Sequence, residues 1–188
     1  MSSYKVAILV SHALFLLAMS VHASEVPVGS GCTCSPNPTT TFIVYIQDVA
    51  YLGTNSNYTS YPVAGIQGTQ FGNGQFGTIN VYDDPVTVAA SPNSTVRGRL
   101  RGVYAVAALG GGVLFITSTI QFTGGQYANS TLNIKGLGPS VINVPAYLGI
   151  DGGTNAFNGA IGNVTLQAIS GQGPNTVIQA TVNYRIAK

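Results

Sequence analysis

The acidic side chains are the residues best suited to proton chemistry in this sequence, and there are only five of them among 188 residues. Both histidines, His12 and His22, lie near the N-terminus. Beyond them, a Ser-His-Asp triad, a Cys-His pair and a histidine-bearing zinc site are all excluded. Any acid–base work in the remainder of the chain must therefore fall to aspartate, arginine and tyrosine.

Asp48 is the acid whose position best suits such work. It ends the segment "TFIVYIQD", in which Phe42, Val44 and Ile46 share its face, because strand side chains repeat every second residue. If this face lines an apolar interior, desolvation would raise the pKa of Asp48 and make it a candidate proton donor. The competing interpretation is a strand-end aspartate that accepts a hydrogen bond from a turn.

The other polar candidates have plainer alternatives. Asp83 and Asp84 precede Pro85 and face opposite ways as neighbours on a strand, so a turn-forming rim role is expected for them. Arg99 belongs to an alternating arginine pattern that is typical of a solvated strand face. Tyr104 is a candidate to bound an aromatic ligand or donate a hydrogen bond, and a plain core tyrosine fits it equally well. No spacing recommends a metal site, and no cofactor is expected.

Eight segments must position these side chains. They are rich in β-branched and aromatic residues and are bounded by Gly, Asn, Pro and Ser clusters, which predicts strands joined by turns. The segments are Thr41–Ala50, Phe76–Asp83, Val96–Leu109, Val113–Phe122, Ser130–Gly136, Val141–Ile150, Gly162–Ile169 and Thr176–Ile186. No stretch predicts a long amphipathic helix. The pattern favours an all-β antiparallel barrel or sandwich, and a barrel of about eight strands can hold a small ligand in its mouth.

The N-terminal region predicts secretion to the extracellular space. Residues 1–23 combine Lys5, an apolar run and a Val-His-Ala ending, which is typical of a cleaved signal peptide rather than a membrane anchor. Residues 24–40 predict a flexible leader, in which Cys32 and Cys34 could pair between chains, form a strained local ring or have no structural role. Four sequons predict N-glycans, at Asn57, Asn93, Asn129 and Asn163.

Low charge excludes two classes of partner. Removing residues 1–23 leaves six basic and five acidic side chains, a net charge near +1. This is too little to indicate nucleic-acid binding or attachment to an anionic membrane. Glycans would supply the solubility that the few charged groups do not.

Five phrases, in order, resemble the plant dirigent protein family, which steers the coupling of phenoxy radicals. They are "FIVYIQD", "FGTINVYDDPVT", "RGRLRGVY", "GGQYANSTLNIKG" and "IDGGTNAFNGAIGNV". The resemblance spans residues 41–188 and implies an eight-stranded antiparallel β-barrel, usually a homo-oligomer such as a trimer or dimer. Allene oxide cyclases share that barrel and a similar glycine turn.

The resemblance also implies a function. A separate laccase or peroxidase in the apoplast would oxidise a phenol such as coniferyl alcohol, and the barrel would direct stereoselective coupling of the radicals to lignan-type products by orientation. The alternatives are a barrel cyclase or isomerase acting on an epoxide or quinone methide, and a non-catalytic cell-wall binding glycoprotein. Arg99 and Asp151 are the substrate-pocket residues implied. Ala156 and Ile161 stand where lignan-forming members tend to carry Asp and Arg.

Overall fold

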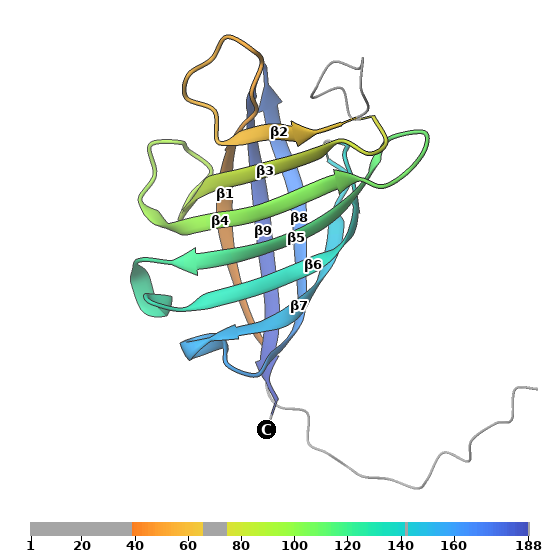
Figure 1. Cartoon of the computed structure of the whole chain (residues 1–188). Helices are drawn as coiled ribbons and strands as arrows, with labels where there is room; N and C mark the ends of the chain where they lie inside the picture. The colour runs from red at the N-terminus through yellow and green to blue at the C-terminus, as the bar shows by residue number, and fades with distance from the viewer. Residues whose placement is uncertain (1–38, 66–74, 142, 188) are drawn as a thin grey trace, which may run out of the picture. The chain divides into compact units, whose positions relative to one another are not determined.

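The computed structural model describes residues 39–65, 75–141 and 143–187. The predicted signal peptide, nearly all of the predicted leader and both cysteines lie outside these residues. The described chain is built almost wholly from antiparallel strands (Figure 1). The strands are β1 (Thr40–Val49), β2 (Ser60–Ala64), β3 (Ile79–Thr87), β4 (Val96–Val106), β5 (Val113–Phe122), β6 (Thr131–Pro139), β7 (Ala146–Thr154), β8 (Ala160–Gln172) and β9 (Asn175–Ile186). Two 3₁₀ turns, η1 (Gly125–Tyr127) and η2 (Asn155–Phe157), complete the elements.

The strands close into an eight-stranded barrel, so the predicted fold class is confirmed. Strands β3 to β9 pair in sequence order, β9 pairs with β1, and β1 returns to β3. The closing seam between β1 and β3 has only two residue pairs, Tyr45 with Thr87 and Ile46 with Val86. The buried side chain of Gln47 reinforces it, because its amide donates to Thr87 Oγ1 over 3.0 Å.

Strand β2 was not predicted from the sequence. It lies along β3 outside the closed ring, in register with the half of β3 that does not pair with β1. Its five residues include Pro62, which lacks a backbone donor and is tolerated in sheets mainly at edges. A run this short that contains proline gives little strand signal in the sequence. In the structure, β2 nevertheless pairs with the part of β3 that β1 leaves unpaired.

Strand β3 also extends beyond its predicted end at Asp83. The Asp-Asp-Pro sequence was interpreted as a turn, yet the strand continues through Pro85 to Thr87. Pro85 lies where the neighbour of β3 changes from β2 to β1, so its missing N–H interrupts the pairing with neither strand. The extension matters because it keeps Asp84 on a strand, facing the opposite way from Asp83.

Even-numbered residues of the barrel strands face the interior. On β9, for example, Ala180, Val182 and Tyr184 are buried while their neighbours are more exposed. One end of the interior is filled by aromatic rings that contact one another with centroids 4.8 to 6.1 Å apart. These rings are Phe42, Phe122, Tyr127, Phe157 and Tyr184. The aromatic cluster closes that end, and the open space of the interior lies elsewhere.

The glycine-rich stretch from Asp151 to Val164 forms the β7–η2–β8 turn and part of its flanking strands. Gly152 adopts φ +87°, which side chains resist, and a Cβ on Gly153 would lie 2.1 Å from the Thr131 carbonyl oxygen. This tight approach delivers Phe157, which is fully buried, into the aromatic cluster. The stretch therefore shapes the closed end of the barrel.

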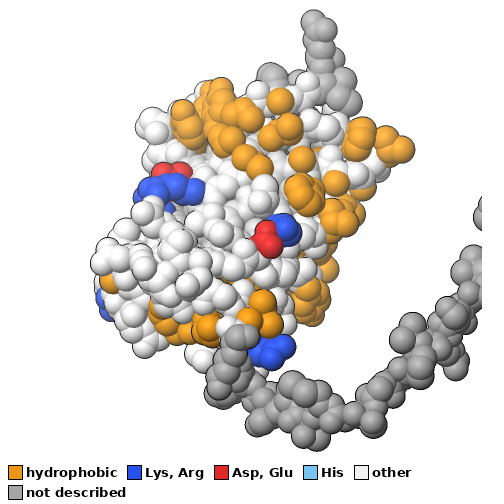
Figure 2. All heavy atoms as spheres, turned by 60° about the horizontal axis from the view of Figure 1, so that its bottom comes forward, with side chains coloured by type: hydrophobic (Ala, Val, Ile, Leu, Met, Phe, Trp, Pro, Cys, Tyr) orange, Lys and Arg blue, Asp and Glu red, His pale blue; other side chains and the backbone are white. Residues whose placement is uncertain are grey.

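The outer face of the barrel carries many apolar side chains and few charges, as Figure 2 shows for one side of the molecule. Exposed apolar side chains on β3, β5, β6 and β7 include Ile79, Val81, Phe115, Leu137 and Tyr147. Among the described residues, no helix is both long and apolar enough to cross a membrane.

Candidate functional site: a cavity with one polar and one apolar wall

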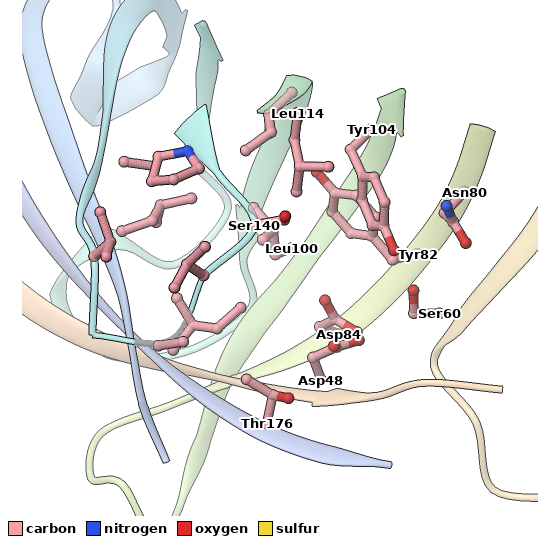
Figure 3. A pocket seen from close by; sticks show the side chains of 18 of the residues that line it. Asp48, Ser60, Asn80, Tyr82, Asp84, Leu100, Tyr104, Leu114, Ser140 and Thr176 are labelled. Carbon is pink, nitrogen blue, oxygen red and sulfur yellow. The ribbon is translucent and has the colours of Figure 1, made fainter. Parts of the chain in front are cut away.

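A cavity of about 440 Å³ occupies the interior away from the aromatic cluster. Its size falls within the range of small-molecule sites in proteins. Figure 3 shows the side chains that line it. Strands β1 to β4 supply most of its polar groups, namely Asp48, Ser60, Asn80, Tyr82, Asp84 and Tyr104. Strands β5 to β8 and the β6–β7 connection supply a mostly apolar wall, including Leu114, Ile116, Pro139, Val144 and Leu166.

Two carboxyls, Asp48 and Asp84, lie next to each other on the polar wall (Figure 3). Both point inward because they occupy even positions on β1 and β3, which pair at the barrel seam. Asp84 is 3% exposed, and its Oδ1 accepts a hydrogen bond of 2.6 Å from the Thr59 hydroxyl. Asp48 Oδ1 is buried without a hydrogen-bond partner among the described residues. An unpaired buried acceptor is costly, so this oxygen is placed to receive a ligand donor.

Burial changes the proton affinity of this carboxyl pair. Desolvation raises the pKa of Asp48 from 3.8 to about 6. The pKa of Asp84 is raised to about 8, mainly by desolvation and to a smaller extent by the negative charge of Asp48. The hydrogen bond from Thr59 acts in the opposite direction and lowers this pKa. Near neutral pH the pair therefore holds about one proton, on the side of Asp84. Two neighbouring groups with separated pKa values can serve as an acid and a base.

Two tyrosines form the aromatic part of the polar wall. Tyr82 and Tyr104 stack with ring centroids 6.0 Å apart. The Tyr82 hydroxyl shares a hydrogen bond with the Ser118 hydroxyl, and burial raises the pKa of both tyrosines. Both phenols thus stay neutral and can present a ring face or a hydroxyl to an aromatic ligand. The structure places the predicted candidates Asp48 and Tyr104 in one cavity.

The other two predicted pocket residues, Arg99 and Asp151, lie outside the lining of this cavity. Arg99 occupies an odd position on β4 and pairs with Asp83 on the outer face, where Arg101 also contacts Asp83 at 3.0 Å. Burial alone would raise the pKa of Asp83, but the hydrogen bonds and positive charges of Arg99 and Arg101 together outweigh it and lower that pKa. Asp151 is likewise exposed and pairs with Lys135 at 2.6 Å.

Ala156 and Ile161 are also exposed and lie outside the lining of the cavity. The four sequon asparagines are exposed as well. Asn57, Asn93 and Asn129 lie in connections between strands, whereas Asn163 lies within β8. Their side chains are accessible in the folded chain, and none of them lines the cavity.

Sequence reasoning missed the functional position of Asp84, which it assigned to a rim. The usable signal was the alternation itself. Since Asp83 and Arg99 pair on the outside, the residue after Asp83 must face inward. Among the described residues, no group of three or more His, Cys, Asp or Glu side chains could hold a metal ion. The cavity offers two carboxyls, hydroxyls and one amide, a donor set suited to hydrogen-bonding a polar organic ligand.

The sequence was compared with known protein families and with curated proteins, and both comparisons find relatives. Residues 39–186 match a family described as dirigent-like protein. The chain is 31% identical over 170 residues to dirigent protein 1 of Arabidopsis thaliana, covering 90% of each chain. It is 30% identical over 141 residues to dirigent protein 16 of the same plant, covering 72% of this chain and 57% of that protein.

A solved structure shows the same fold. A pterocarpan synthase dirigent protein is 25% identical and superposes with a TM-score of 0.71, covering 79% of this chain and 90% of that one. Pterocarpan synthase 1 of Glycine max is 32% identical over 87 residues, which is 46% of this chain and 47% of that protein. The family match, the near full-length relative and the shared barrel agree, and this chain belongs to the dirigent family.

Proposed function

We propose that the cavity binds a phenol able to form a quinone methide and directs the stereochemistry of the bond that this intermediate makes. The observation that carries the proposal is the carboxyl pair Asp48 and Asp84 opposite an apolar wall. Asp84 is buried, and Asp48 is partly buried with its Oδ1 out of contact with solvent. The polar and apolar walls would orient an amphipathic aromatic molecule in one way. Similarity to pterocarpan synthases supports a reaction of this class.

A balanced reaction follows from the pair holding one proton. Asp84 gives its proton to a benzylic hydroxyl as the carbon–oxygen bond breaks and water leaves, while the phenolic proton passes to Asp48. A second hydroxyl of the substrate then adds to the benzylic carbon of the quinone methide. Asp48 returns its proton to the phenolic oxygen, and the added hydroxyl releases its proton to Asp84. One water is lost overall, and the pair regains its starting state.

The test is a ring-closing assay with the purified chain. The substrate is a racemic ortho-hydroxybenzyl alcohol that carries a second phenolic hydroxyl within reach of the benzylic carbon. We expect faster ring closure than in buffer and an enantiomeric excess on chiral chromatography. A racemic product formed at the buffer rate would contradict the proposal.

Coupling of phenoxy radicals is the second candidate function. The observation that favours it is the stacked pair Tyr82 and Tyr104, whose rings can flank an aromatic radical within the cavity. In this scheme a separate laccase or peroxidase oxidises coniferyl alcohol, and the coupled product is a bis-quinone methide that can use the same carboxyl pair. Incubation with laccase and coniferyl alcohol, followed by chiral chromatography, tests this candidate. A racemate equal to the laccase-only control argues against it and leaves the cyclase or a non-catalytic binding role.

The proposal also includes secretion into the apoplast and N-glycosylation. Its support is the predicted signal peptide with four exposed sequon asparagines. Expression in a plant secretion system should yield a chain starting near Ser24 whose mass falls on glycosidase treatment. Retention of residues 1–23 with an unchanged mass would contradict this part.

A further inference from the structure

The hydroxyl of Thr59 connects the carboxyl pair to the backbone of β1. The N–H of Val49 donates to Thr59 Oγ1 over 2.9 Å, and Thr59 Oγ1 donates to Asp84 Oδ1 over 2.6 Å. A hydroxyl has a single proton to donate. Because its oxygen already accepts from Val49, that proton is directed at Asp84.

The backbone of Thr59 is fixed on both sides of the seam. Its N–H donates to the Val49 carbonyl over 2.8 Å, and its own carbonyl accepts from the Asp83 N–H over 2.9 Å. Thr59 is therefore tied to β1 and β3, the two strands that carry Asp48 and Asp84. The hydroxyl is therefore held from both strands and can act as a fixed partner of Asp84.

We propose that Thr59 is a positioning residue: its hydroxyl holds the Asp84 carboxyl in the cavity wall and lets it release its proton more readily than burial alone would allow. The inference rests on the proposed role of Asp84 as proton donor. Its effect on catalysis would be indirect, since Thr59 acts through Asp84 and is absent from the cavity lining.

Several other groups also affect the pKa of Asp84, and most of them oppose the effect of Thr59. Burial and the negative charges of Asp48 and Asp83 favour the protonated carboxyl, whereas Arg99, beyond the sheet, favours ionisation. Asp84 also raises the pKa of Tyr82 and Tyr104, which line the same wall and stay neutral. The hydrogen bond that the Thr59 hydroxyl donates to Asp84 also favours the ionised carboxyl.

Thr59 is also the third residue of the Asn57 sequon, and this overlap shapes the controls. Thr59→Val keeps the side-chain shape but removes both the hydroxyl and the sequon. Thr59→Ser keeps both. Asn57→Gln removes the sequon alone and leaves the hydrogen bonds of Thr59 in place, so it separates loss of a glycan from loss of the hydroxyl.

The experiment is a carboxyl titration by nuclear magnetic resonance, which needs no substrate. Four of the five acidic residues are aspartates, so a chain labelled with ¹³C at aspartate Cγ gives four signals that single Asp→Asn variants assign. We expect the Asp84 signal to titrate at the highest pH. Its midpoint should rise by about one pH unit in Thr59→Val, return in Thr59→Ser and stay unchanged in Asn57→Gln.

Each outcome bears on Thr59 separately from the proposed reaction. An Asp84 midpoint that is the same in Thr59→Val and in the wild type overturns the inference, as does an equal shift in Asn57→Gln. If Thr59→Val does not fold, Thr59→Ala takes its place, and an Asp84 midpoint that is the same in Thr59→Ala and in the wild type overturns the inference. If the titrations behave as expected and no phenol is turned over, the proposed function fails while the Thr59–Asp84 linkage stands.

With an active assay, the pH profile gives a second readout. Thr59→Val should move the alkaline limb of kcat upward by about one pH unit and lower kcat more than it changes KM, with Thr59→Ser near wild type. A purely structural role would lower the yield of folded protein and leave the profile of the remaining activity in place.

Discussion

Asp48 and Asp84 differ in their partners, and this difference assigns them different tasks. Asp84 is held by Thr59 and keeps its proton to the higher pH, whereas Asp48 presents an unpaired oxygen to the cavity. An acid and a base with separate pKa values suit a reaction that must both give and take a proton. We therefore expect Asp48 and Asp84 to titrate at different pH values, whereas replacing either one by asparagine should lower activity to a similar extent.

Replacing either carboxyl by its amide should remove the proton chemistry and keep the volume. We expect Asp84→Asn and Asp48→Asn each to lower product formation by about 10²-fold or more, the usual scale for a positioned acid or base. The matched control is Asp151→Asn, which lies on the outer face and should leave the rate unchanged. Equal rates for Asp84→Asn and Asp151→Asn in the ring-closing assay would remove Asp84 from the mechanism.

The same carboxyls make the fold more stable in acid. Their pKa values are raised to about 6 and about 8 from 3.8, so between roughly pH 4 and 8 the folded chain binds more protons than the unfolded chain. Stability must then fall as pH rises through this window. We expect Tm to drop by about 5 °C or more from pH 4 to pH 8 and the drop to shrink in Asp84→Asn. A Tm that rises over this range would contradict the buried pair.

Sequence analysis found half of this pair, and the reason is local. Asp48 follows three apolar residues on its own face, so its inward direction could be predicted. Asp84 stands beside Asp83 and Pro85, and that sequence is typical of a turn. Only the strand register shows that β3 passes through the proline. Arg99 and Asp151 came from the resemblance to the family, and their partners on the outer face were not visible in the chain.

At the scale of elements, the alternation of side chains predicted seven strands closely enough to give the barrel. The connections and the ends of the strands were predicted less accurately. Strand β7 begins at Ala146 and runs to Thr154, later than the predicted Val141–Ile150, because the glycines after Ile150 resemble a turn and yet continue the sheet. Glycine has no side chain to report which face is buried, so the pattern is lost there.

Gly153 offers a test of that segment. An alanine Cβ would meet the Thr131 carbonyl oxygen at 2.1 Å and Phe157 Cβ at 2.7 Å. We expect Gly153→Ala to lower Tm by about 3–10 °C through backbone displacement at the closed end. Gly149→Ala on the same strand is the control, since its nearest atom would be 3.8 Å away. Equal melting temperatures for the two variants would show that the turn yields without cost.

At the scale of the whole molecule, we propose that the chain forms the homo-oligomer that the family resemblance implies, and the exposed apolar side chains on the outer face support this. Phe115 lies beside Ala105 on β4 and Leu137 on β6, and both Phe115 and Leu137 are exposed. Contiguous apolar surface of this kind commonly marks a protein–protein interface. A second copy of the chain is the occupant expected here.

A charged side chain introduced on the apolar outer face around Phe115 should dissociate the homo-oligomer. We expect wild-type protein to sediment as a dimer or trimer and Phe115→Glu to sediment as a smaller species that keeps the barrel spectrum in circular dichroism. Ala90→Glu, an exposed change in the β3–β4 connection, is the control and should keep the wild-type state. A monomeric wild type, or dissociation by Ala90→Glu alone, would exclude this face as the interface.

The division of the cavity into two walls has a consequence for how such a protein can diverge. The proton-handling groups lie on β1 to β4, and the apolar wall that would shape the ligand lies mainly on β5 to β8. A substitution at Leu114, Val144 or Leu166 changes the outline of the space without touching Asp48 or Asp84. Descendants of one gene could thus exchange one substrate for another, or one product enantiomer for its mirror image, while inheriting the chemistry intact.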